Sequence, residues 1–87
     1  MSQTRAIPRL TLGMAASYRI CAQGALDASW SDRLGGMRIT TCRREGYAPV
    51  TMLIGPLRDQ AALLGVLNSL YDLHLPLVSV ERVSGEA

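Results

Sequence analysis

Apolar and polar side chains alternate along two stretches of the chain, residues 18–23 and residues 37–42. An alternation with a period of two puts one set of side chains on each face of a strand. We therefore predict a strand in each stretch, and Gly24 is expected to end the first. The alternating sets of the first strand are Tyr18, Ile20 and Ala22 against Arg19, Cys21 and Gln23.

Two later stretches are rich in β-branched and aliphatic residues, which are enriched in strands. Residues 50–54 predict a third strand, which Gly55-Pro56 is expected to end, and residues 77–83 predict a fourth. The segment Arg43-Arg44-Glu45-Gly46-Tyr47 is typical of a turn. We expect it to join the second and third strands as a hairpin.

The clearest helix is predicted over residues 59–73, where Asp59 is a capping residue and Pro76 prevents continuation. Its apolar positions recur at helical spacing and are expected to pack on the sheet: Leu63, Leu67, Leu70, Tyr71 and His74, with Leu64 widening the stripe. A shorter segment, residues 27–34, begins at an Asp and stops at Gly35-Gly36, so it holds at most about two turns.

The order strand, short helix, strand, strand, helix, strand is the split βαβ or ferredoxin-like arrangement, with an abbreviated first helix. Right-handed crossovers place the first strand in the middle of a four-stranded antiparallel sheet, beside the fourth. Both helices then cover one face of this α+β fold and leave the other face open. The alternation leaves undecided which of the two sets on the first strand faces that open side.

A chain of 87 residues supplies one hydrophobic core. We place the domain at residues 17–83, between a flexible N-terminal tail at 1–16 and a C-terminal tail at 84–87. The apolar run at 10–16 is interrupted by Thr11 and Gly13, so a secretory signal is not expected. Because a core this small supplies only about 3–5 kcal/mol, we expect a homodimer.

The composition is that of an ordered globular chain, with 48% apolar and 18% charged residues. All nine basic residues are arginines. The guanidinium group suits bidentate contacts with anions, but a preference for Arg codons explains the same composition. The arginines are spread along the sequence and the net charge is only +2, so a nucleic-acid partner is not expected.

The two cysteines, Cys21 and Cys42, lie in separate predicted strands and lack a metal-ligand spacing. A disulfide requires that their strands be neighbours in a suitable register. Free thiols are otherwise expected, in a reducing compartment. With no stretch of the roughly 20 apolar residues that span a bilayer, the sequence predicts a cytoplasmic protein without a membrane partner.

Four residues are candidates for a binding site. Trp30 and Tyr18 are large aromatics that anchor ligands or interfaces. Arg58 precedes a helix N-terminus, where anions are favoured, and His74 follows the C-terminus of the same helix. Each has a structural alternative, as a packing, turn or capping residue. No spacing joins them into a catalytic set, and no cofactor or metal is predicted.

The segments Asp59-Gln60-Ala61-Ala62-Leu63 and Asp72-Leu73-His74-Leu75-Pro76-Leu77-Val78-Ser79-Val80 carry a resemblance, together with Tyr18-Arg19-Ile20 and Leu26-Asp27-Ala28-Ser29-Trp30-Ser31. Over roughly residues 18 to 82 the chain resembles a group of small uncharacterised bacterial proteins. In that group the segment after the Trp-Ser pair is usually more aromatic than Arg33 and Leu34 here. The resemblance implies a bacterial domain of this shape and carries no catalytic residue across.

These observations favour a non-enzymatic homodimeric module that binds a small ligand or a protein and pairs through its open sheet face or an edge strand. An alternative is a small cofactor-free enzyme of the dimeric α+β barrel type. In that case a closed apolar cavity holds the substrate, and Trp30, Tyr18 or His74 orients it.

Overall fold

The computed structural model describes residues 15–83, so the predicted tails lie almost entirely outside the described residues. Its elements, in chain order, are β1 (Ala16–Gln23), the 3₁₀ helix η1 (Ala28–Leu34), β2 (Arg38–Cys42), β3 (Val50–Leu57), α1 (Gln60–Asp72) and β4 (Leu77–Val83). Within these residues no helix is both long and apolar enough to cross a membrane.

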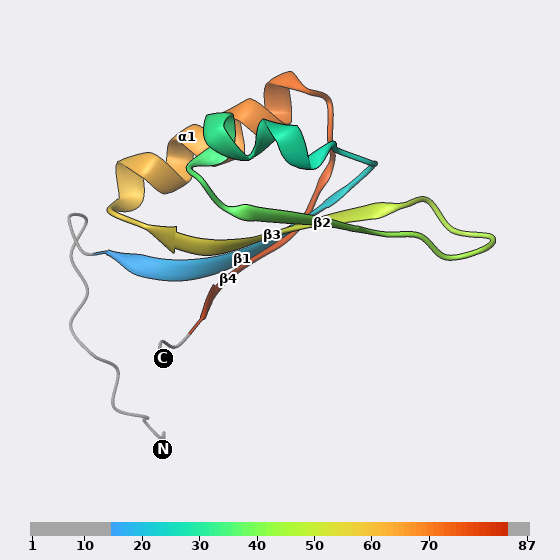
Figure 1. Cartoon of the computed structure of the whole chain (residues 1–87), viewed down its shortest axis with the longest axis horizontal. Helices are drawn as coiled ribbons and strands as arrows, with labels where there is room; N and C mark the ends of the chain where they lie inside the picture. Colours follow the sequence, from blue (N-terminus) through green and yellow to red (C-terminus); the bar gives the residue numbers. More distant parts are fainter. Residues whose placement is uncertain (1–14, 84–87) are drawn as a thin grey trace, which may run out of the picture.

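The strands form one four-stranded sheet in the order β2-β3-β1-β4, and each neighbouring pair is antiparallel. The predicted α+β class and the antiparallel sheet are confirmed, with β1 in the interior beside β4. The β2–β3 hairpin extends well beyond the rest of the sheet (Figure 1). Its tip turns at Arg44, whose carbonyl accepts a hydrogen bond from the Tyr47 amide at 2.9 Å.

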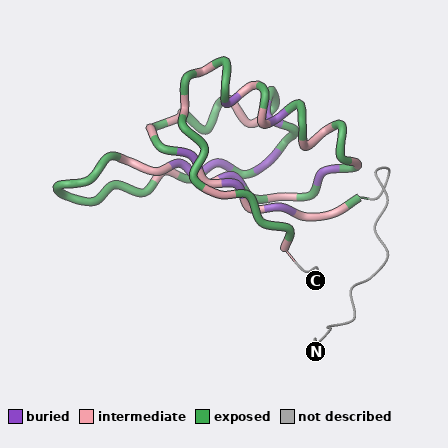
Figure 2. Tube along the Cα trace, turned by 180° about the vertical axis from the view of Figure 1, so that it is seen from behind, coloured by how far each residue is buried: buried purple, intermediate pink, exposed green. Residues whose placement is uncertain are grey.

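Both helices lie on the same side of the sheet, and no element of residues 15–83 covers the other side (Figure 1). The buried residues of β1 are Tyr18, Ile20 and Ala22, so this set faces the helices. Arg19, Cys21 and Gln23 therefore face the open side, which settles the alternative that the sequence left undecided. Burial is concentrated between the sheet and the helices, and the hairpin tip is exposed (Figure 2).

Helix α1 has the predicted ends. Asp59 is its N-cap, and the Asp59 carboxylate accepts a hydrogen bond from the Ala62 amide at 2.8 Å. At the other end, the Leu75 amide donates to the Leu70 carbonyl and the His74 amide donates to the Tyr71 carbonyl, which is the pair of bonds of a Schellman motif.

The apolar face of α1 is rotated from the predicted one. Val66 and Leu70 are its buried residues, whereas Leu64, Tyr71 and His74 are exposed. The prediction included Tyr71 and His74 and missed Val66. Because nearly every position on one half of the helix is apolar, the spacing alone did not identify which of these residues point to the core.

Strand β3 is longer than predicted, because it continues through Gly55-Pro56 to Leu57. Pairing with β2 stops at Ile54, which lies opposite Arg38, and pairing with β1 continues to Leu57. The end of β3 is therefore a local edge of the sheet. A proline without an amide hydrogen is tolerated at such an edge.

The strands that carry Cys21 and Cys42 are separated by β3, and both thiols are free. The register required for a disulfide within the chain is therefore not present. Both residues lie on strand positions that face the open side of the sheet, because their neighbours in sequence, Ile20, Ala22 and Thr41, point toward the helices.

Candidate functional site

The structure separates the four candidate residues. Tyr18 is only 4% exposed, and its hydroxyl accepts a hydrogen bond from the Gln60 side chain at 2.9 Å. Trp30 is half-buried on η1 and packs against the core cluster, with the Arg33 guanidinium 5.1 Å from its ring. These two aromatics connect the helices to the sheet and do not share a cavity wall among the described hollows.

Arg58 and His74 are exposed and lie at opposite ends of α1, which is about 20 Å long. Arg58 immediately precedes the N-cap Asp59, which already occupies a free amide of the first turn. His74 has a φ angle of 62°, the left-handed conformation that ends a Schellman motif. Its backbone thus explains its place at the end of the helix.

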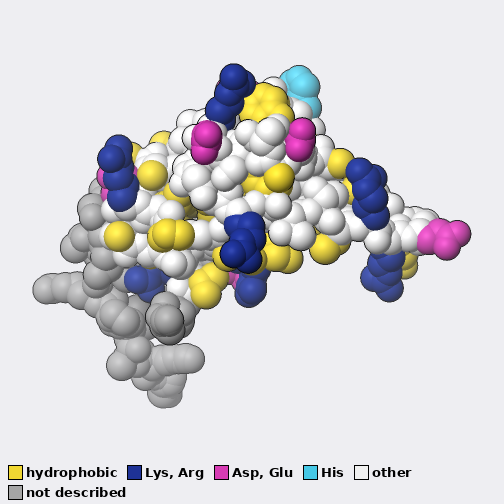
Figure 3. Space-filling model, in the orientation of Figure 1, with side chains coloured by type: hydrophobic (Ala, Val, Ile, Leu, Met, Phe, Trp, Pro, Cys, Tyr) yellow, Lys and Arg dark blue, Asp and Glu magenta, His cyan; other side chains and the backbone are white. Residues whose placement is uncertain are grey.

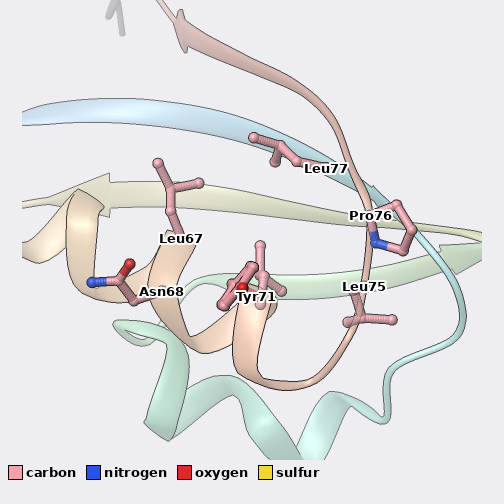
Figure 4. A pocket seen from close by; sticks show the side chains of 7 residues that line it. Leu67, Asn68, Tyr71, Leu75, Pro76 and Leu77 are labelled. Carbon is pink, nitrogen blue, oxygen red and sulfur yellow. The ribbon is translucent and has the colours of Figure 1, made fainter.

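A groove lies between the C-terminal half of α1 and the start of β4, with a volume of about 300 Å³. Its lining is almost entirely apolar and comprises Leu67, Asn68, Leu70, Tyr71, Leu75, Pro76 and Leu77. Leu67 and Tyr71 from α1 and Leu77 from β4 point into the space between helix and strand (Figure 4). We call this hollow the α1–β4 groove.

The groove exists because α1 packs mainly on β3 and η1. Leu77 is 53% exposed, although it lies opposite the buried Ala22 and on the side of the sheet that the helices cover. Val80 lies opposite Ile20 and is exposed for the same reason. The helix-facing side of β4 is therefore an uncovered strip beside α1.

Backbone hydrogen bonds hold Leu75 and Pro76, the residues between α1 and β4 that line one end of the groove. The Schellman motif brings Leu75 back onto Leu70, the apolar contact that commonly accompanies this motif. The Gln23 amide then donates to the Pro76 carbonyl at 2.8 Å. Gly24 has a φ angle of 121° and lies so close to Leu75 that a side chain at this position would collide with it.

Tyr71 is 79% exposed and separates the groove from a second hollow, of about 240 Å³, which His74, Leu75 and Pro76 also line. Strand β4 is an edge strand, so its outer amide and carbonyl groups have no partner in the sheet. Leu77 is the residue of β4 that lines the groove, and it begins the uncharged stretch Leu77-Val78-Ser79-Val80, which Glu81 and Arg82 follow. Val78 is an extra residue there, because the register shifts between Cys21 and Ala22.

Charges do not gather into a site in the described part of the chain. Residues 15–83 contain no cluster of three or more His, Cys, Asp or Glu side chains suited to a metal ion. Arginine side chains are scattered over the face of the molecule that Figure 3 shows. The single ion pair between described residues joins Arg19 and Glu81 on the open sheet face, at 2.7 Å.

The chain belongs to a family described as a domain of unknown function (DUF8691), which matches residues 17–81. The match covers all six elements of the structure except the ends of β1 and β4. No curated protein and no solved structure matches the chain. The description of the family gives no activity, so the function has to be argued from the surface.

The α1–β4 groove was not found by sequence reasoning. The sequence contains part of the evidence for the groove, because it shows that Tyr71 is apolar and that the segment Leu77-Val78-Ser79-Val80 is uncharged. Their exposure depends on where α1 lies over the sheet, which no spacing in the sequence records.

Proposed function

We propose that this protein is a non-enzymatic homodimeric module that binds an extended apolar peptide segment in the α1–β4 groove. One observation carries the proposal. An apolar hollow, bordered by the exposed Tyr71 and Leu77, lies at the start of a free strand edge whose first four residues carry no charge.

The combination suits recognition by strand addition. An extended peptide satisfies the unpaired amide and carbonyl groups of β4 with its own main chain. Alternate side chains of that peptide then point to the helix-covered side, into the space between Leu67, Tyr71 and Leu77. Aliphatic side chains fit this lining, because it offers Asn68 as its only side chain with polar hydrogen-bonding groups besides the Tyr71 hydroxyl.

The proposal also includes a ferredoxin-like fold, a cytoplasmic location and a bacterial origin. The order of elements and the sheet order β2-β3-β1-β4 support a ferredoxin-like arrangement in which η1 replaces the first helix. Two free cysteines support a reducing, cytoplasmic compartment. A bacterial origin is proposed on the motifs given above.

The barrel-type enzyme is less well supported by the same surface. It requires a closed apolar cavity, and the α1–β4 groove and the neighbouring hollow beside His74 both lie open on the surface. Tyr18, which was one of its three orienting residues, is buried and bonded to Gln60. A binding surface therefore fits these residues better than a substrate chamber does.

The test is a titration of the protein with a synthetic peptide in which valine and threonine alternate between lysine ends. Binding is monitored through the chemical shifts of the protein's backbone amides. We expect shifts along β4 from Leu77 to Val80 and on the Tyr71 side of α1. Leu77→Asp places a charge in the groove and should weaken binding at least about tenfold, the effect of roughly 1.4 kcal/mol.

Leu64→Asp is the matched control, because Leu64 is similarly exposed on α1 but does not line the groove. This variant should bind the peptide as the parent chain does. Shifts confined to the open sheet face, or binding that is insensitive to Leu77→Asp, would contradict the proposal.

A further inference from the structure

The open face of the sheet is a grid of side chains whose rows run across the strands. One row contains Arg38 on β2, Ile54 on β3, Arg19 on β1 and Glu81 on β4, since each lies opposite the next. The next row contains Thr40, Met52, Cys21 and Ser79 in the same order. These two rows occupy the middle of the face.

The centre of this face is mostly apolar, with Arg19 as its one charged side chain, and its rim is polar. Met52 and Cys21 are half-buried although no element covers them, and Ile54 beside them is 40% exposed. Arg38 and Thr40 on β2 border this centre on one side, and Ser79 and Glu81 on β4 border it on the other. An apolar centre within a polar rim is the usual anatomy of a protein interface.

The charges of the first row are arranged with opposite signs at its two ends. Arg38 stands on one edge strand with no acidic partner among residues 15–83. Glu81 stands on the other edge strand and pairs with Arg19. A carboxylate has two oxygens with acceptor sites to spare, so Glu81 can accept a second guanidinium.

A two-fold axis that runs along the strands, between β3 and β1, reverses the order of the strands in a facing copy. It places β2 over β4 of the second copy while each row stays at its own level. Arg38 of one copy then faces Glu81 of the other at both ends of the row. In the centre, Met52 faces Cys21, and Ile54 faces the aliphatic stem of Arg19. Sheets that pack face to face lie within about 30° of alignment, a rotation that a long Arg side chain accommodates.

We propose that a second copy of this chain covers the open sheet face, with Arg38 of each subunit paired with Glu81 of the partner subunit. This inference rests on the proposed homodimer and assigns its surface. The α1–β4 groove lies on the opposite side of the sheet, and the outer edge of β4 stays free. The dimer therefore presents two groove sites, one on each outer side.

The experiment uses charge reversal at the two ends of the row, read out by size-exclusion chromatography with light scattering. Arg38→Glu creates two Glu–Glu contacts in its homodimer, and Glu81→Arg creates two Arg–Arg contacts. We expect each variant alone to be monomeric, with a dimer dissociation constant raised on the order of 100-fold. An equimolar mixture of the two should form a heterodimer, because both of its contacts join opposite charges.

Arg58→Glu is the matched control, since it makes the same change in net charge at an exposed position outside the four strands and should remain dimeric. Met52→Asp tests the apolar centre independently of the ion pairs and should also give a monomer. Far-ultraviolet circular dichroism identifies any variant that has lost its fold.

The outcomes separate the two proposals. A parent chain that is dimeric, together with Arg38→Glu and Met52→Asp variants that are folded and equally dimeric, overturns the assignment of the surface and leaves the homodimer standing. A parent chain that is monomeric at about 100 μM overturns both the homodimer and the surface assigned to it. Folded monomeric single variants that fail to associate when mixed overturn the pairing of Arg38 with Glu81.

Discussion

His74 occupies the left-handed position at the end of α1 with a φ angle of 62°, where most helices of this kind have glycine. Its imidazole is exposed, and among the described contacts only its backbone amide is engaged, with the Tyr71 carbonyl. The residue therefore carries a conformational penalty that glycine would not.

We predict that His74→Gly stabilises the domain by about 0.5–1 kcal/mol. Glycine removes the left-handed penalty of about 1–2 kcal/mol, which is larger than the free-energy cost of glycine's greater conformational entropy in the unfolded chain. His74→Ala, which keeps the penalty, is the control and should change stability little. Urea unfolding of the three chains at equal concentration measures the difference. A loss of stability in the glycine variant would assign His74 a stabilising side-chain role.

At the scale of an element, α1 shows which features a sequence determines locally. Asp59 and Pro76 define the ends of the helix through hydrogen bonds and chain geometry within a few residues, and those predictions were confirmed. Which side of α1 faces the sheet depends on distant partners. The prediction therefore exchanged Tyr71 for Val66, and the groove that Tyr71 borders was missed.

The N-cap of α1 gives a prediction at this scale. Asp59→Ala removes the acceptor of the Ala62 amide and should destabilise the domain by about 1 kcal/mol, or roughly 4–8 °C in melting temperature. Asp72→Ala is the control, because its carboxylate is exposed at the negative end of the helix dipole. It should leave stability unchanged or raise it slightly. Equal losses in both variants would contradict the capping role.

On the scale of the whole molecule, the sequence predicted that β1 lies in the middle of the sheet beside β4, but not the surfaces that follow from the sheet. The central position of β1 came from general rules of chain connection. The row that joins Arg38 to Glu81 arises from the register of four strands, and these two residues are 43 positions apart in the chain. The strand β3 shows the same limit, since its pairing with β1 carries it past Gly55-Pro56.

The small core and the apolar centre of the open face together predict that folding and association are linked. Ten buried apolar side chains form the core of the described domain, and Met52 and Ile54 on the open face add to it only when they are covered. A ligand or subunit that binds only the folded state raises its stability by mass action.

We therefore predict that the melting temperature rises with protein concentration, on the order of 2–4 °C for each tenfold increase. The Arg38→Glu variant should melt at a temperature independent of concentration, and scanning calorimetry of both chains from about 10 μM to 1 mM makes the comparison. A parent chain whose melting temperature is constant over this range would show that the domain folds without a second copy.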